Sequence, residues 1–171
     1  MRVIAETDRL VLSALTGRDA PFVRRLVTDP DWLRFIGDRG VRTLRDARAY
    51  IRDGPTAMIR AHGVGLYRVG LRGSGTPVGL CGLLRRDGLA DVDLGFALLP
   101  EHRGAGYARE AAAAVLAHAR DLSHVRVAAL VMPANAASVR VLASLGFARD
   151  GVHRLGDETL DLYVRDGPAA P

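Results

Sequence analysis

The spacing of hydrophobic residues changes several times along the chain, and each change marks an expected element of secondary structure. Alternating or short continuous apolar runs predict seven strands, over residues 7–15, 64–71, 77–84, 90–99, 125–132, 147–152 and 159–164. Apolar residues three and four positions apart predict helical segments over 17–28, 31–36, 44–61, 106–120 and 135–145. Strands and helices in this order indicate a mixed α/β fold built on one central sheet.

Turn and capping residues set the boundaries of these elements. Thr16 and Thr43 each stand three positions before an aspartate, which is the capping-box spacing that starts a helix. Gly54-Pro55 is expected to end or kink the segment 44–61. Asp87-Gly88 is a strong signal for a two-residue hairpin between the second and third of three antiparallel strands.

Length and composition bound the class of protein. The 171 residues are 49% hydrophobic and 25% charged, which suits one domain over residues 1–165, and a disordered tail is expected over 166–171. No apolar run reaches the roughly 18 residues of a membrane span, and the N-terminus lacks a secretory signal. One cysteine, Cys81, excludes an internal disulfide and favours a reducing, cytoplasmic location. Five histidines without ligand spacing predict no metal site.

Charge does not indicate a nucleic-acid partner, although the net charge is +5. Every cationic side chain is an arginine, and the arginines are dispersed among aspartates rather than gathered in one stripe. Aromatic residues are scarce, at 5% of the chain. A nucleic-acid-binding domain is therefore disfavoured, while the mild positive field would help an anionic cofactor to approach.

A glycine-containing turn joins an expected strand to an expected helix at Arg103-Gly104-Ala105-Gly106-Tyr107-Ala108. The first N–H groups of a helix have no partner within the helix, and glycines let the backbone approach a phosphate closely. The turn therefore predicts either an anion site or a simple connection. It is not a Walker A loop, because no Gly-Lys-Ser/Thr follows, and it lacks the third glycine of a dinucleotide fingerprint.

The turn in this setting resembles motif A of the GNAT N-acetyltransferases, Arg/Gln-x-x-Gly-x-Gly/Ala. In that family the amides of the loop hold the pyrophosphate of acetyl-CoA, and the pantetheine arm pairs with the end of the preceding strand. The side chain of Arg103 either adds charge to this site or is a solvated surface arginine. The resemblance implies cofactor contacts from Leu98, Leu99, Arg103, Gly104, Ala105, Gly106, Tyr107 and Ala108.

A second motif follows at the start of the last expected helix. Asn135 is a good N-cap, Ser138 follows it, and Leu145-Gly146-Phe147 ends the helix with glycine at C′. This spacing resembles GNAT motif B, and it adds Asn135 to the implied cofactor contacts. The opening residues 7–12 resemble the RimJ/RimL-like branch, with Ser13 where an arginine is usual.

The resemblance covers nearly all of residues 7–165. It implies a mostly antiparallel sheet of about seven strands with helices on both faces.

The strand over residues 90–99 has two different faces, because alternate side chains point to opposite sides. One face is apolar and is expected to be core: Val92, Leu94, Phe96 and Leu98. The other is small or acidic and leaves room for a ligand: Asp91, Asp93, Gly95 and Ala97. The amine substrate is expected over this second face, walled by Trp32, Phe35 and the segment 44–61.

Asp93 is the candidate base for acetyl transfer to an amine, either directly or through water. Its position resembles that of a carboxylate, more often glutamate, on this strand in many GNATs. The alternative is a carboxylate that only orients the substrate. For the acid, Leu142 stands where many GNATs have tyrosine, and Ser138 matches a serine thought to serve in the RimJ/RimL-like branch. Cys81, expected to be buried, is a poor nucleophile, so direct transfer in a ternary complex is expected.

The resemblance implies an acetyl-CoA-dependent N-acetyltransferase that modifies a primary amine, either a protein N-terminus or a small molecule. The alternative is a non-catalytic acyl-CoA-binding or regulatory module on the same fold. No nucleic-acid or membrane partner is expected, and pairing of edge strands would give a homodimer.

Overall fold

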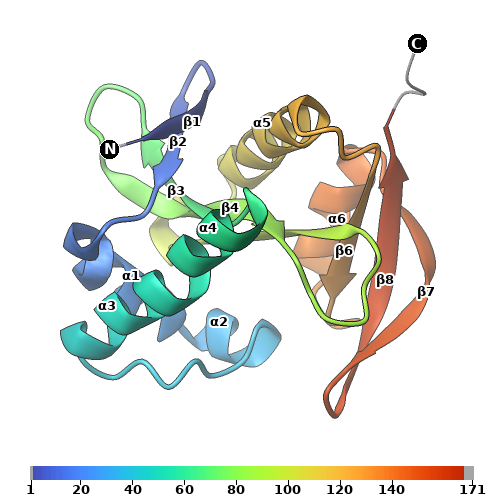
Figure 1. The fold of residues 1–171 in the computed structure, drawn as a ribbon, viewed down its shortest axis with the longest axis horizontal. Helices are drawn as coiled ribbons and strands as arrows, with labels where there is room; N and C mark the ends of the chain where they lie inside the picture. Colours follow the sequence, from blue (N-terminus) through green and yellow to red (C-terminus); the bar gives the residue numbers. More distant parts are fainter. Residues whose placement is uncertain (1, 168–171) are drawn as a thin grey trace.

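An eight-stranded sheet forms the centre of the molecule in the computed structural model, which describes residues 2–167 (Figure 1). Its strands run in the order β1-β2-β3-β4-β5-β6-β8-β7, and only β5 and β6 pair in parallel. The strands are β1 (Val3–Glu6), β2 (Leu10–Ala14), β3 (Leu66–Leu71), β4 (Pro77–Leu84), β5 (Val92–Leu98), β6 (Arg126–Val131), β7 (Ala148–Leu155) and β8 (Glu158–Asp166).

The sheet has one strand more than the sequence predicts. The missed strand, β1, is only four residues long and carries no deeply buried side chain. It exists because its backbone pairs with β2, which the pattern of its own residues does not reveal. Asp166, expected in the tail, is the last residue of β8 and pairs with Arg126. The rest of the expected tail, from residue 168 onward, lies outside the described residues.

The helices lie where the hydrophobic spacing predicts them. They are α1 (Ala20–Val27), α2 (Pro30–Phe35), α3 (Leu44–Ile51), α4 (Ala57–His62), α5 (Tyr107–Asp121) and α6 (Ala136–Ser144), with short turns η1 (Gly17–Asp19), η2 (Arg52–Thr56) and η3 (Pro100–His102). The kink expected at Gly54-Pro55 is the π-helical turn η2, since proline lacks the N–H that a regular α-helix needs. None of the described helices has the length and apolar composition needed to cross a membrane.

Helices cover both faces of the β1–β5 half of the sheet (Figure 1). On one face, α5 packs against β1, β2, β4 and β5 through alanines that are fully buried, including Ala111, Ala112 and Ala119. These small side chains let the helix axis lie close to the sheet. On the other face, α1, α2 and α3 bury a second core with Leu66, Leu80 and Leu99.

The sheet splits at β5 and β6, which pair only at Val92–Val127 and Asp93–Ala128. Beyond these pairs the two strands diverge into a fork. The N–H of Leu99 donates to the carbonyl of Val78 at 2.9 Å, so odd-numbered residues of β5 bond to β4. The backbone groups of the even-numbered residues, Phe96 among them, therefore face the opening of the fork.

The connection between β4 and β5 is longer than the predicted two-residue hairpin. Asp87-Gly88 does form a turn, closed by a hydrogen bond of 3.2 Å from Leu89 N to Arg86 O. The turn lies within a loop over residues 85–91, because the two strands separate before they reach it. This loop carries Arg86 back over the start of β5, where it meets Asp93.

Candidate active site

The loop between β5 and α5 has the backbone conformation that its glycines allow. Gly104 and Gly106 have φ values of +79° and +82°, in a region that favours glycine. The first hydrogen bond within α5 runs from Glu110 N to Gly106 O, so the N–H groups of residues 107–109 have no partner within the helix. No heavy atom lies within 4 Å of a Cβ built on Gly104, which leaves open space beside the loop.

Residues just before β2 hold this loop in place. Arg9 donates from Nε to Glu110 Oε2 at 2.6 Å and from Nη1 to the carbonyl of Ala105 at 3.1 Å. Its guanidinium also lies 4.7 Å from the centre of the Tyr107 ring. Thr7 Oγ1 donates to Glu110 Oε1 at 2.6 Å. Sequence reasoning missed this support, because about 100 residues separate Arg9 from its partners.

Arg103 joins the loop to α2 rather than standing free. Its Nη2 lies 2.6 Å from Asp29 Oδ1, its Nη1 lies 2.5 Å from Asp31 Oδ2, and its Nε donates to Leu98 O at 3.1 Å. Asp29 also caps α2 by accepting hydrogen bonds from Asp31 N and Trp32 N. Arg103 therefore clamps the loop to α2, and its side chain, 37% exposed, also lines the cavity that opens beside the loop.

Arg103→Met is expected to lower the free energy of unfolding by about 1–3 kcal/mol, because Asp29 would keep a buried charge without its guanidinium partner. Urea denaturation measures this change. Arg140→Met is the matched control: Arg140 lies beside the same loop and is exposed, and it forms no ion pair with any described residue. The control should stay within about 0.5 kcal/mol of the wild type. Equal effects of the two substitutions would contradict the clamp.

A cavity of about 430 Å³, here called the loop cavity, opens beside the glycine loop. Its lining includes Leu98, Gly104, Gly106, Tyr107, Ala108 and Ser138. Arg109 and Arg140 are exposed at its edge, and neither forms an ion pair within the described chain. Leu99 and Ala105 do not line it: the N–H of Leu99 bonds within the sheet, and the carbonyl of Ala105 accepts from Arg9.

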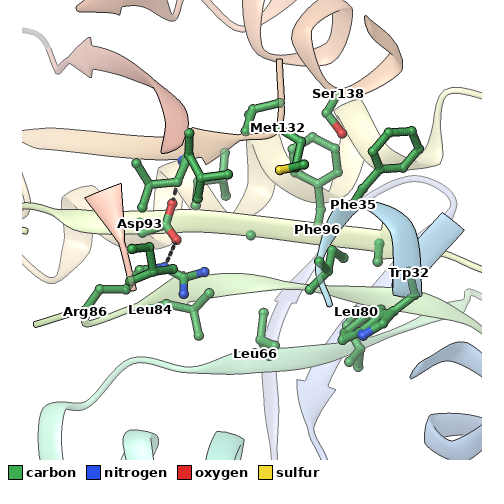
Figure 2. A pocket seen from close by; sticks show the side chains of 18 of the residues that line it. Trp32, Phe35, Leu66, Leu80, Leu84, Arg86, Asp93, Phe96, Met132 and Ser138 are labelled. Carbon is green, nitrogen blue, oxygen red and sulfur yellow. Dashed lines mark hydrogen bonds and ion pairs between the residues drawn. The ribbon is translucent and has the colours of Figure 1, made fainter. Parts of the chain in front are cut away.

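A second cavity of about 300 Å³, here called the fork cavity, lies where β5 and β6 diverge (Figure 2). Its floor includes Gly95 and Ala97, and its walls include Trp32, Phe35, Tyr50, Met58, Leu66 and Leu84. Trp32, Phe35 and the segment 44–61 thus lie where the sequence places them. Phe96, expected in the core, is only half-buried and lines both cavities, as do Asn135 and Ser138. The two cavities therefore meet beside Phe96.

Asp93 lies at one end of the fork cavity with its side chain only 2% exposed (Figure 2). Oδ1 accepts a hydrogen bond of 3.0 Å from Leu130 N, and Oδ2 pairs with Nε of Arg86. The carboxylate therefore closes the fork by satisfying a β6 amide that β5 no longer reaches. Burial raises the pKa of Asp93, and this effect outweighs the opposing influence of Arg86 and the Leu130 N–H.

Ser138 and Asn135 lie at the other end, at the start of α6. Asn135 Oδ1 accepts from Ser138 N at 3.1 Å, which confirms the predicted cap. The Ser138 hydroxyl, which makes no hydrogen bond to another described residue, lies beside Phe96 and Phe35 (Figure 2). The structure does not bring Ser138 into contact with Asp93; the fork cavity separates them.

Neither the cysteine nor a metal-binding cluster contributes to these cavities in the described residues. Burial raises the pKa of the Cys81 thiol, which lies in the core and lines neither cavity. Within residues 2–167, no group of three or more histidine, cysteine, aspartate or glutamate side chains could hold a metal ion.

A sequence profile described as "Acetyltransferase (GNAT) domain" matches residues 9–148. The chain belongs to the GNAT family. The match to this GNAT chain runs from β2 through α6, which includes most of the elements that line the two cavities. The mixed sheet with its single parallel pair of strands is the GNAT fold. The protein is accordingly an N-acetyltransferase.

Similar proteins cover almost the whole GNAT chain. The uncharacterized N-acetyltransferase YoaA of Bacillus subtilis (strain 168) is 27% identical over 154 residues, which are 88% of this chain and 86% of YoaA. An acetyltransferase from Agrobacterium tumefaciens str. C58 superimposes with a TM-score of 0.82 at 26% identity, over 96% of this chain and 94% of that one. RimL, a ribosomal L7/L12 alpha-N-protein acetyltransferase in complex with coenzyme A, shares the fold with a TM-score of 0.79 at 17% identity, over 99% and 100% of the two chains.

Proposed function

We propose that the protein transfers the acetyl group of acetyl-CoA directly to a primary amine. The observation that carries this proposal is the meeting of two cavities at Phe96, one beside a glycine loop and the other ending at a buried carboxylate. One cavity suits a cofactor with phosphates and the other suits an acceptor, so the two reactants would meet in one ternary complex.

The residues of the loop cavity fit acetyl-CoA, which supplies an activated acetyl thioester. The unpartnered N–H groups of residues 107–109, at the positive end of a 15-residue helix, would hold the pyrophosphate. Arg109 and Arg140, which line the same cavity as Arg103, would add charge beside it. The backbone groups of Phe96 and the N–H of Leu98, which face the fork, would pair with the pantetheine arm, while the carbonyl of Leu98 accepts from Arg103.

Asp93 is proposed as the base that removes a proton from the attacking amine. Arg86 and Leu130 N each occupy one carboxylate oxygen, and each oxygen keeps a further lone pair. A water relay therefore suits this geometry better than a direct contact. The raised pKa of Asp93 strengthens it as a base, since proton transfer is most efficient when the pKa of the base approaches the working pH.

Groups beside Phe96 are proposed to act on the thioester of acetyl-CoA. The Phe96 N–H faces the fork and would donate to the thioester carbonyl as charge develops on its oxygen. Ser138, at the junction of the cavities, is proposed to protonate the departing thiolate, with water as the alternative donor. Cys81 is buried in the core and lines neither cavity, so its thiol is not placed to carry the acetyl group.

Thermal unfolding with and without acetyl-CoA tests the proposal, with coenzyme A and ATP as comparison ligands. At a concentration 100 times its dissociation constant, a ligand stabilises the folded state by about 2.7 kcal/mol. For a chain of this size the midpoint is expected to rise by about 5–10 °C. Release of coenzyme A with a panel of amines then measures transfer.

The outcomes separate the proposal from its alternatives. A shift with acetyl-CoA, a smaller shift with ATP, and turnover on an amine would support it. Binding without turnover on any amine or peptide would favour a non-catalytic acyl-CoA-binding module. No shift at millimolar acetyl-CoA would contradict the role of the loop.

A further inference from the structure

One guanidinium in the fork cavity has donors that the protein does not use. Arg86 pairs with Asp93 through Nε alone, and its side chain is 25% exposed. Nη1 and Nη2 of Arg86 form no hydrogen bond with any residue in the range 2–167. In Figure 2 these two nitrogens lie on the side of the guanidinium that faces Leu84 and the interior of the cavity.

The surroundings make these free donors significant. The neighbouring walls are largely apolar, so a guanidinium there gives up water without a full replacement. Both oxygens of Asp93 are already engaged, and the other carboxylate of the lining, Glu158, lies beyond ion-pair distance from Arg86. Two adjacent N–H donors in the plane of a guanidinium match the two oxygens of a carboxylate.

A second positive charge reaches the same part of the cavity. Arg39 also lines it, and one of its terminal nitrogens donates to Ile36 O at 3.2 Å. Burial raises the pKa of Tyr50 in the cavity wall, and the charges of both Arg39 and Arg86 oppose that rise. The Tyr50 hydroxyl thus lies within the field of both arginines, which makes this end of the cavity favourable for an anion.

We propose that the acceptor is a small amino acid-like molecule whose carboxylate binds Nη1 and Nη2 of Arg86. This inference rests on the proposed transferase activity and specifies its substrate class. Arg86 is in direct contact with Asp93, so an amine that reaches Asp93 through one water places a carboxylate on Arg86 only when few atoms separate the two groups. A free α-amino acid has that spacing. The apolar walls and the volume of about 300 Å³ suit a hydrophobic side chain.

The carboxylate would bind without entering the reaction. The amide C–N bond forms as the C–S bond of the thioester breaks, one amine proton passes through the relay water to Asp93 and then to solvent, and the thiolate takes up a proton from Ser138 or water. Arg86 is therefore a specificity residue. A peptide N-terminus has a neutral carbonyl where a free amino acid has its carboxylate, so the site is expected to discriminate against it.

Matched acceptors test this discrimination: L-phenylalanine, L-phenylalaninamide and phenethylamine, followed by leucine and methionine with their amides. The amine of the amide is the more weakly basic, so a larger fraction of it is uncharged and able to attack at neutral pH. A preference for the free acid would therefore run against the supply of reactive amine. We expect kcat/KM to favour the free acid on the order of 10- to 100-fold, the effect of a hydrogen bond to a charged group. Arg86→Met should reduce this ratio to about one, and Arg86→Lys should restore part of it.

The ratio of two acceptors cancels any general loss of activity that follows when Asp93 loses its partner. Arg120→Met, at an exposed arginine of α5 outside both cavities, is the control and should leave the ratio unchanged. The inference is overturned if the wild type acetylates amides, peptides or simple amines with the same kcat/KM as the free acids. It is also overturned if Arg86→Met keeps the preference for the free acids.

A binding measurement separates failure of this inference from failure of the proposed function. With coenzyme A present, N-acetyl-L-phenylalanine should raise the unfolding midpoint more than N-acetylphenethylamine does, and Arg86→Met should remove the difference. If acetyl-CoA binds and simple amines are acetylated but no such difference appears, the proposed function stands and the carboxylate site is wrong. If no amine is acetylated, transfer fails and this binding difference alone decides the site.

Discussion

Gly106→Glu is expected to abolish the stabilisation of the protein by acetyl-CoA. Gly106 is the N-cap of α5 with φ at +82°, and its Cβ position lies 3.4 Å from Nη2 of Arg9. A side chain there would strain the loop and press on the residue that supports it. Its carboxylate would also repel the phosphates that the helix N-terminus is proposed to attract.

The size of the expected loss in affinity for acetyl-CoA follows from losing these contacts together. We expect the dissociation constant for acetyl-CoA to rise at least about 100-fold, which corresponds to about 2.7 kcal/mol. Calorimetric titration or the shift in unfolding midpoint measures the change.

Gly73→Glu is the matched control, because Gly73 also has positive φ, at +94°, but lies in the β3–β4 turn with open space around it. It reports the cost of the backbone conformation alone. If both variants lowered the unfolding midpoint equally and both still bound acetyl-CoA, the glycine loop would not be the phosphate site.

Features fixed by neighbouring residues were predictable from sequence. Asn135 caps α6, and Gly146, with φ at +83°, ends it through hydrogen bonds from Phe147 N to Leu142 O and from Gly146 N to Ala143 O. Each of these interactions spans at most five residues. Backbone conformation and local hydrogen bonding determine them, so the residue types alone reveal them.

Features fixed by distant partners were not predictable. The residues around Arg103 do not show that its partners are Asp29 and Asp31, which lie more than 70 positions earlier in the chain. The Arg86–Asp93 pair depends on how the loop over residues 85–91 folds back, although only seven residues separate the two. Such pairs decide which cations remain free for a ligand: Arg103 is engaged by two aspartates, whereas Arg86 keeps two nitrogens unpaired among the described residues.

Asp93→Asn is expected to lower kcat by about 100- to 10,000-fold, the usual contribution of a general base. The amide cannot remove a proton from the amine. Leu130 N and Arg86 Nε donate to different carboxylate oxygens, so the amide also sets an NH2 group against one of these two donors. A loss of about 1–3 kcal/mol in the free energy of unfolding is therefore expected alongside the loss of rate.

The comparison with Asp91→Asn and the pH dependence identify the base. Asp91 lies just before β5, pairs with Arg126 at 3.3 Å and lines neither cavity, so its amide variant should retain kcat. Because burial raises the pKa of Asp93, activity in the wild type should fall as the pH drops through a value above the ~3.9 of a free aspartate. Asp93→Asn should lose that acid limb. If it keeps both the limb and most of kcat, Asp93 only closes the fork, and the amine must lose its proton to solvent.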